Sequence, residues 1–376
     1  MSSLALMKPL RPLKILHTEA ATDFGGQEQY ILRLMRELRR QGHNVEALCQ
    51  PQAILTKVLR EEGFTVHTLP MDGFKGMVKG ILFTRKLLKA GRFDIVNSHS
   101  RRDTLIGASA ARLAKVPVIV RTRHLAKKVG SLLSYNILPN RVITPSEYVK
   151  QYLIQKGVAA EAIEVVYPSI DAEILDTAPK LNLRAALQLP PESVLVGCVA
   201  VLRTEKGHQE LIEAMAPLCH RYPDLHLVIV GGGQPNYDQL QAAIHAQKLA
   251  EQMHMLGTRT DVPSLLPNFD FFALATHTEA SGTAFVEAGA AGLAVVGTHV
   301  GGVPEMMQAN KSGLLVPLFD IVALREAIET LYRQPELRQQ MGQIGRTFCR
   351  SDERFTPYAM GQRTITAYSK WLKELQ

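Results

Sequence analysis

The chain alternates short apolar runs with longer segments in which apolar residues recur every three or four positions. The runs predict buried strands and the longer segments predict amphipathic helices. This alternation is typical of parallel sheets with helices on both faces. In the first half the predicted strands cover 13–18, 43–50, 65–70, 93–99 and 116–124, and the apolar segments 141–146 and 163–171 close it. In the second half they include 194–201, 226–230, 269–276 and 293–298.

The periodicity stops between residues 171 and 192, where three prolines occur. A chain of 376 residues is too long for one ordinary core. We therefore predict an N-terminal domain over residues 1–180 and a C-terminal domain over 181–354, followed by a helical segment over 355–376 that contains the only tryptophan, Trp371.

The segment 279–287 directly follows the apolar run 269–276. We expect a helix from Gly282 to Ala291, with Ser281 as its cap and Gly292 as its stop. A helix that begins at the carboxyl end of a strand presents free N–H groups and a partial positive charge. The junction therefore predicts a phosphate site.

Side chains around this junction can add contacts to the same ligand. Gly282 allows the backbone to approach closely, and Glu279 lies in the loop, where it can reach a sugar hydroxyl. Thr283 and Glu287 are one helical turn apart on one face. The alternative is that the two glutamates are solvated surface residues, since such a spacing also occurs by chance.

Composition narrows the class of protein. The chain is 46% hydrophobic and 21% charged, and its four cysteines are scattered, which argues against a disulfide framework or a zinc site and suits a reducing cytoplasm. No apolar run approaches the ~20 residues that span a bilayer. Residues 1–12 are expected to form a loose leader. The net charge of +8 favours an anionic partner.

The two glutamates, the Gly/Ala-rich helix and the following Val300-Gly-Gly-Val-Pro-Glu305 resemble the signature of retaining glycosyltransferases of family 4. The resemblance implies the GT-B fold, with two doubly wound Rossmann-like α/β domains facing each other across a cleft and the C-terminal helix crossing back onto the first domain. It also implies that Glu287 holds the nucleotide ribose, that Glu279 lies beside the donor sugar, and that the backbone between them binds the diphosphate.

Other segments of the second half match the same family. Arg203 and Lys206 stand between a strand end and a helix start, where two cations can neutralise a diphosphate leaving group. The resemblance assigns them that role. A nucleotide can approach the backbone at Gly231 and Gly232. By resemblance, Thr258 and Arg259 are neighbours of the base; surface charges and a tight turn are the plainer alternatives.

The first half matches more loosely. Gly25 and Gly26 follow the first strand and, by resemblance, face the donor diphosphate. His99 ends a strand, at a position that the family places near the donor sugar and the acceptor hydroxyl. Relatives often carry a second histidine two residues earlier, where this chain has Asn97. The alternatives are a structural histidine and a simple strand–helix turn.

Basic residues gather near two strand ends of this half. The resemblance places Thr122 and His124 on the acceptor side, and we assign Arg121 and Arg123 to an anionic or phosphorylated acceptor. Arg101, Arg102, Lys127 and Lys128 extend the cluster, and the alternative is that these charges form a solvated face. The segment 73–91 predicts a basic amphipathic helix, which either lies on an anionic membrane or packs on the sheet with a solvated basic face.

Taken together, the residues and the resemblance predict a retaining glycosyltransferase that moves a sugar from a nucleotide-diphosphate donor, with UDP as the expected nucleotide, to a glycan or glycolipid hydroxyl. We expect neither a metal nor another cofactor, since no Asp-x-Asp motif occurs. Lipopolysaccharide or a related envelope glycan is the expected acceptor, at the inner face of the membrane in the cytoplasm, with no nucleic-acid partner. A nucleotide-sugar epimerase and a non-catalytic binding protein remain alternatives.

Overall fold

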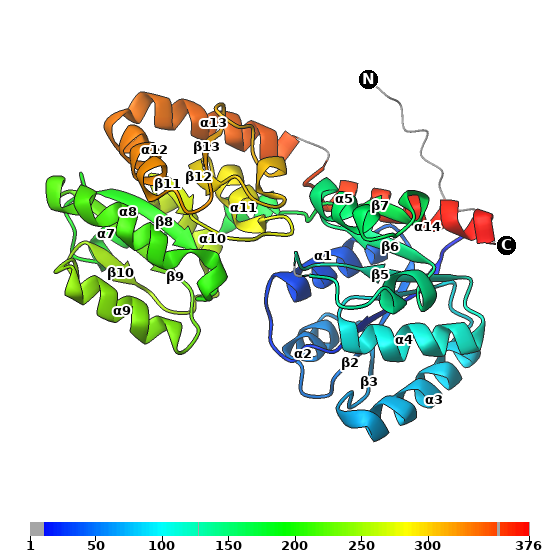
Figure 1. Ribbon diagram of the computed structural model, residues 1–376. Coiled ribbons are helices and arrows are strands. Elements are labelled where there is room, and N and C mark those ends of the chain that lie inside the picture. The colour runs from blue at the N-terminus through cyan, green and yellow to red at the C-terminus, as the bar shows by residue number, and fades with distance from the viewer. Residues whose placement is uncertain (1–10, 127, 352–353, 376) are drawn as a thin grey trace. The chain divides into compact units, whose positions relative to one another are not determined.

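The computed structural model of the chain describes residues 11–126, 128–351 and 354–375 (Figure 1). It divides into two compact units, Met1–Ser169 with Thr356–Gln376, and Ile170–Phe355. Nearly all of the predicted leader, residues 1–10 of 1–12, and Lys127 of the predicted basic cluster lie outside the described residues. No helix in the described parts of the chain is long and apolar enough to cross a membrane.

The first unit contains a parallel sheet in the order β3-β2-β1-β4-β5-β6-β7. Its strands are β1 (Lys14–Glu19), β2 (Asn44–Cys49), β3 (Thr65–Thr68), β4 (Ile95–Ser98), β5 (Val118–Thr122), β6 (Arg141–Thr144) and β7 (Ile163–Val165). Its longer helices are α1 (Gly26–Arg40), α2 (Ile54–Glu61), α3 (Gly73–Gly91), α4 (Arg101–Ala114), α5 (Glu147–Gln155) and α14 (Pro357–Leu375).

The second unit contains a parallel sheet in the order β10-β9-β8-β11-β12-β13. Its strands are β8 (Val194–Val199), β9 (Leu225–Val230), β10 (Met253–Met255), β11 (Phe271–Leu274), β12 (Ala294–Thr298) and β13 (Gly313–Val316). Its longer helices are α8 (His208–Arg221), α9 (Asn236–Ala246), α11 (Thr283–Ala290), α12 (Ile321–Arg333) and α13 (Pro335–Ser351). The expectation of two doubly wound α/β domains is confirmed.

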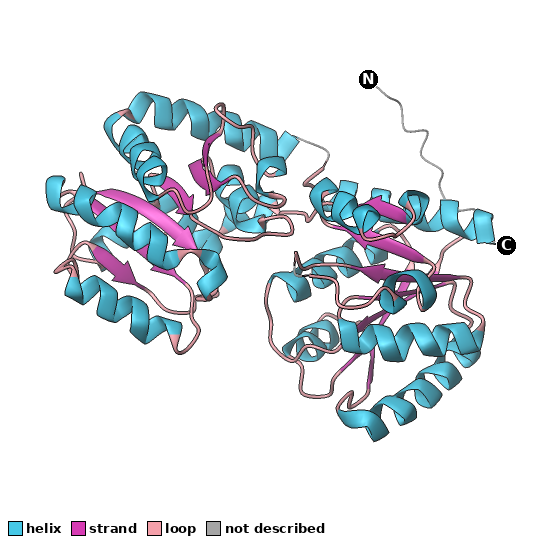
Figure 2. Ribbon diagram, in the orientation of Figure 1, coloured by secondary structure: helices cyan, strands magenta, loops and turns pink. Residues whose placement is uncertain are grey.

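Helices cover both faces of each sheet (Figure 2), which explains why most strand residues are buried. In the first unit, one core cluster joins the sheet to α1, α2 and α14, and a second joins it to α3 and α4. The segment predicted as a linker differs from expectation, since it contains the short helices α6 (Ala172–Thr177) and α7 (Leu183–Ala186). Helices of four to six residues are too short to show an apolar period.

Helix α14 is tied to the sheet of the first unit through polar groups as well as the core. Trp371 and Tyr368 are fully buried. The Asn97 amide donates to the Tyr368 hydroxyl at 2.8 Å and accepts from the Thr122 hydroxyl at 2.9 Å. Asn97, which departs from the family pattern, therefore joins α14 to β4 and β5.

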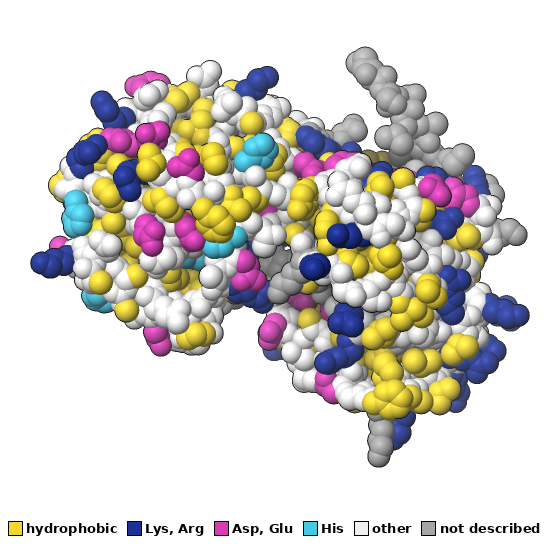
Figure 3. Space-filling model, viewed as in Figure 1, with side chains coloured by type: hydrophobic (Ala, Val, Ile, Leu, Met, Phe, Trp, Pro, Cys, Tyr) yellow, Lys and Arg dark blue, Asp and Glu magenta, His cyan; other side chains and the backbone are white. Residues whose placement is uncertain are grey.

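The other face of this unit exposes apolar side chains on α3 and α4 (Figure 3). We call Phe74, Val78, Leu82 and Leu113 the α3–α4 patch; their exposed fractions are 76%, 43%, 60% and 55%. The three residues on α3 recur every fourth position and form one stripe. Helix α3 itself contains no acidic residue.

Candidate active site

The second unit brings its predicted donor-binding loops together at one point of the sheet. Strand β8 has β9 on one side and β11 on the other, so the connections from β8 diverge there. Ligands of open α/β sheets bind at the carboxyl ends of strands at such a point. The loop after β11 is held to the loop after β8, because His277 N–H and the Thr276 hydroxyl both donate to the carbonyl of Glu205, at 2.8 and 3.1 Å.

Lys206 follows β8, and Glu279 follows β11. Their side chains form an ion pair, with exposed side-chain fractions of 24% and 13%. The cation predicted to bind diphosphate thus contacts the carboxylate predicted to lie beside the sugar. Arg203, at the start of the same loop, is exposed and makes no ion pair within the described chain. The structure therefore places one paired and one unpaired cation at this edge.

Helix α11 begins at Thr283, and its cap is Gly282 rather than Ser281, which corrects the sequence prediction. Gly282 has φ 87°, in the left-handed region where glycine is favoured, and no side chain caps the helix. Ser281 is buried. The first N–H groups of α11 are consequently not taken by a capping side chain. Glu287 lies one turn after Thr283, as expected.

The Gly301-Gly302 turn supports the Glu279 loop from behind. A Cβ on Gly301 would lie 2.0 Å from the Glu279 carbonyl oxygen, and Gly302 N–H donates to that oxygen at 3.2 Å. Only glycine allows this contact, because real Cβ atoms do not approach a backbone oxygen so closely. The motif after β12 thus fixes the backbone that carries Glu279.

The predicted base neighbours lie at the ends of β9 and β10. A Cβ on Gly232 would lie 2.1 Å from the Thr258 hydroxyl, and Gly231 N–H donates to Gly257 at 2.9 Å. These glycines have a packing role whether or not a ligand binds. Arg259 is exposed and bound by Asp261 at 2.7 and 2.6 Å.

In the first unit, the corresponding divergence falls between β1 and β4. Gly25 caps α1, and its N–H donates to the Glu28 carboxylate at 2.7 Å. Glu28 therefore occupies one donor of the predicted phosphate cradle. A Cβ on Gly26 would meet no atom within 4 Å, so packing does not require glycine there.

Three histidines from adjacent strands form a hydrogen-bonded chain at the same edge. His17 Nδ1 lies 2.8 Å from His99 Nε2, and His99 Nδ1 lies 2.9 Å from His124 Nε2. His17 and His99 are 1% and 2% exposed, whereas His124 is half-buried. His99, predicted to reach the ligand, is thus enclosed, and His124 is the member that reaches the surface.

Burial keeps this chain neutral. It lowers the pKa of both His17 and His124 to about 3, and it lowers the pKa of His99 well below its usual value, with the two neighbouring rings adding to the effect. Neutral rings donate and accept hydrogen bonds but carry no charge. His99 and His124 therefore suit the orientation of a polar ligand better than the binding of an anion.

Two buried carboxyls beside the histidines were not predicted. Burial, with a smaller contribution from the nearby Asp103 carboxyl, raises the pKa of Glu19 to about 8. Burial also raises the pKa of Asp103. Glu19 accepts from the N–H groups of Ala20 and Ala21 at 2.7 and 2.8 Å. The signal in the sequence was the pair of polar residues His17 and Glu19, at and just after the end of a predicted buried strand.

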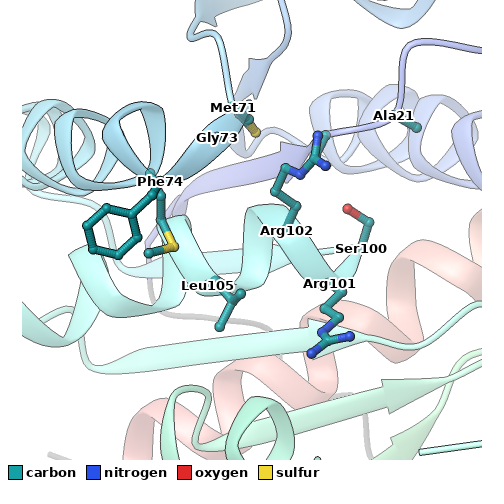
Figure 4. Close-up of a pocket in the computed structure, with 10 residues that line it drawn as sticks. Ala21, Met71, Gly73, Phe74, Ser100, Arg101, Arg102 and Leu105 are labelled. Carbon is teal, nitrogen blue, oxygen red and sulfur yellow. The ribbon is translucent and has the colours of Figure 1, made fainter. Parts of the chain in front are cut away.

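A cavity of about 700 Å³ lies next to these groups (Figure 4). Figure 4 shows Phe74 and Leu105 on one side and Ser100, Arg101 and Arg102 on the other. Further lining residues are Met71, Met77, Ala20 and Ala21. One wall is therefore apolar and the other cationic.

The structure does not bring Arg121 and Arg123 to this cavity. Both are buried, and their guanidinium carbons lie 4.1 and 5.5 Å from the ring centre of Tyr135. Arg121 also donates to the Ser134 carbonyl at 3.2 Å. The exposed cations at the cavity are instead Arg101, which makes no ion pair among the described residues, and Arg102, which pairs with Asp72.

Comparison with known proteins agrees with the fold. A model of the family described as "Glycosyl transferases group 1" matches residues 179–348, and a model of "Glycosyltransferase Family 4" matches residues 24–174. A solved glycosyltransferase from Rickettsia africae superimposes with a TM-score of 0.87 at 20% identity, over 96% of this chain and 99% of the other. The chain is a glycosyltransferase with the GT-B fold.

Two further proteins resemble this glycosyltransferase over most of their length. D-inositol 3-phosphate glycosyltransferase of Saccharomonospora viridis is 25% identical over 372 residues, which cover 86% of this chain and 84% of the relative. The Anabaena protein HepE, solved in complex with UDP, has a TM-score of 0.82 at 21% identity, over 94% of this chain and 98% of its own.

Proposed function

We propose that this glycosyltransferase moves a sugar, with retention at the anomeric carbon, from a UDP-sugar to a hydroxyl of a phosphorylated acceptor. The observation that carries the donor side is that Arg203 and Lys206 follow β8 and the start of α11 follows the neighbouring β11, with Lys206 paired to Glu279 between them. The solved complex of HepE with UDP supports the choice of nucleotide.

The donor diphosphate would replace Glu279 as the partner of Lys206. Without ligand, that ion pair keeps two partly buried charges neutralised. When the diphosphate binds, Lys206 and Arg203 neutralise it together with the free N–H groups of α11, and Glu279 is released toward the sugar. In this proposal Glu287 holds the ribose and Thr258 contacts the base.

The same groups stabilise the charge that grows on the leaving diphosphate as the glycosidic bond breaks. They can supply the neutralisation that a divalent cation supplies in other transferases. A donor phosphate oxygen takes the proton of the acceptor hydroxyl, and no covalent nucleophile is assigned. His99 contributes through His124, whose ring orients a ligand oxygen.

The acceptor would bind in the cavity beside β1 and β4. Its cationic wall, Arg101 and Arg102, suits a phosphate, and its apolar wall suits the carbon face of a sugar or polyol. The name of the Saccharomonospora relative, which acts on a phosphorylated polyol, supports this acceptor class. We propose that the protein works in the synthesis of an envelope glycan, such as lipopolysaccharide, at the inner face of the membrane in the cytoplasm.

A panel of nucleotide sugars tests the donor side. The true donor stabilises the fold by mass action, by about 2.7 kcal/mol at a hundred times its dissociation constant. Lys206→Ala should lose this stabilisation while Lys311→Ala, at an exposed site of the same unit, keeps it. Equal stabilisation of all three proteins would reject the site. Turnover of the donor to its epimer with no acceptor present would favour the epimerase instead.

A further inference from the structure

The α3–α4 patch and the acceptor cavity form one continuous surface. Phe74 belongs to both, and Met77, in the next turn of α3, lines the cavity. Proteins rarely leave such a contiguous group of large apolar side chains in water without a partner. The patch therefore requires an occupant, and that occupant must reach the cavity mouth.

The charges around the patch identify the occupant. Lys79, Lys86 and Lys89 are exposed on α3 beside the apolar stripe, and Arg112 and Lys115 are exposed on and just after α4 beside Leu113. Figure 3 shows basic side chains bordering the apolar area. An apolar stripe with lysines along it matches the boundary between acyl chains and anionic head groups.

The two walls of the cavity also fit a lipid from such a membrane. A phosphate held at Arg101 and Arg102 would have the apolar side chains of Phe74 and Leu105 opposite it (Figure 4). Arg102 forms an ion pair with Asp72. Arg101 has no ion-pair partner among the described residues and is therefore the cation available to a phosphate. A ligand with a phosphate joined to an apolar chain satisfies both walls, and its chain can continue along the patch.

We propose that the α3–α4 patch lies on an anionic membrane and that the cavity takes the phosphate-bearing head group of a lipid acceptor from that membrane. The acceptor part rests on the proposed function, because it places the reacting hydroxyl on this head group. The membrane part rests only on the patch and its charges.

Vesicle co-sedimentation tests the membrane part. The full chain should bind vesicles of phosphatidylcholine with about one third phosphatidylglycerol, and bind pure phosphatidylcholine at least tenfold more weakly. Val78→Ser with Leu82→Ser should lower binding at least tenfold, since both side chains are exposed and neither lines the cavity. Ile54→Ser with Val322→Ser, equally exposed elsewhere, is the matched control.

Two short ligands test the cavity. Dihexanoyl phosphatidic acid should bind at least tenfold more tightly than glycerol 3-phosphate, and Arg101→Gln with Arg102→Gln should weaken the binding of both ligands, because both carry the phosphate. Equal affinity for the two ligands would overturn the lipid acceptor in favour of a free phosphorylated compound. A dimer in light scattering that Val78→Ser with Leu82→Ser dissolves, without vesicle binding, would overturn the membrane in favour of a second copy.

The outcomes of these two tests can be distinguished from a failure of the proposed function. Stabilisation by nucleotide sugars depends on the second unit and should be the same in the patch variant, Val78→Ser with Leu82→Ser, and in the cavity variant, Arg101→Gln with Arg102→Gln. Loss of donor binding in all proteins would refute the transferase site, whereas vesicle binding would stand.

Discussion

Ionisation of the buried Glu19 carboxyl destabilises the folded first unit. It is 1% exposed, and burial raises its pKa from 4.5 to about 8. Glu19→Gln keeps an oxygen that accepts from the N–H groups of Ala20 and Ala21, and the Gln27 amide can rotate to accept from the new amide. The variant therefore removes the titration while it preserves the hydrogen bonds.

The size of the effect follows from proton linkage. Between about pH 5.5 and pH 8 the unfolded chain has lost this proton and the folded chain keeps most of it, so stability falls as the pH rises. Each pH unit with one extra bound proton changes the free energy of unfolding by about 1.4 kcal/mol. Over this interval Glu19→Gln should gain about 3 kcal/mol relative to the wild-type protein. The buried histidines titrate alike in both proteins and cancel in the difference.

The assay is urea unfolding followed by tryptophan fluorescence. Trp371 is the only tryptophan and is fully buried in the core of the first unit, so its signal reports on that unit. Glu61→Gln, on the exposed face of α2, should stay within about 0.5 kcal/mol of wild type at both pH values. If the difference in unfolding free energy between Glu19→Gln and the wild-type protein does not change with pH, Glu19 is not protonated in the folded protein and the reasoning is wrong.

Further substitutions test the donor site and the stability of each of the two units. Lys206→Ala should lower the rate of sugar transfer by about a hundredfold or more, with little change in unfolding, because it removes leaving-group stabilisation; an unchanged rate would contradict that role. Glu279→Gln should lower transfer and still bind UDP, measured by calorimetry. Gly207→Ala should destabilise the second unit by at least about 2 kcal/mol, since φ is +68° and a Cβ would lie 1.8 Å from a backbone oxygen; normal thermal unfolding would refute this. Tyr368→Phe should cost about 1 kcal/mol in urea unfolding, because the Asn97 amide loses an acceptor; a neutral effect would show that water replaces it.

The amino-acid pattern alone determined the alternation of strands and helices, the doubly wound class and the strand–loop–helix junction after β11. These features depend on apolar period and on glycine near strand ends, which are local properties of the chain. The helix over 73–91 was also predicted at its observed bounds. The cap of α11 was missed because Ser281 is a good cap by type, whereas the residue that caps the helix is Gly282, whose backbone is left-handed.

Only the tertiary structure decided which side chains meet. His17, His99 and His124 are far apart in the sequence and touch because β1, β4 and β5 are neighbours in register. Arg121 and Arg123 looked like ligands at a strand end, but Tyr135 covers them. Sequence distance carries no information about such contacts, since they depend on strand order and on which face of the sheet each side chain leaves.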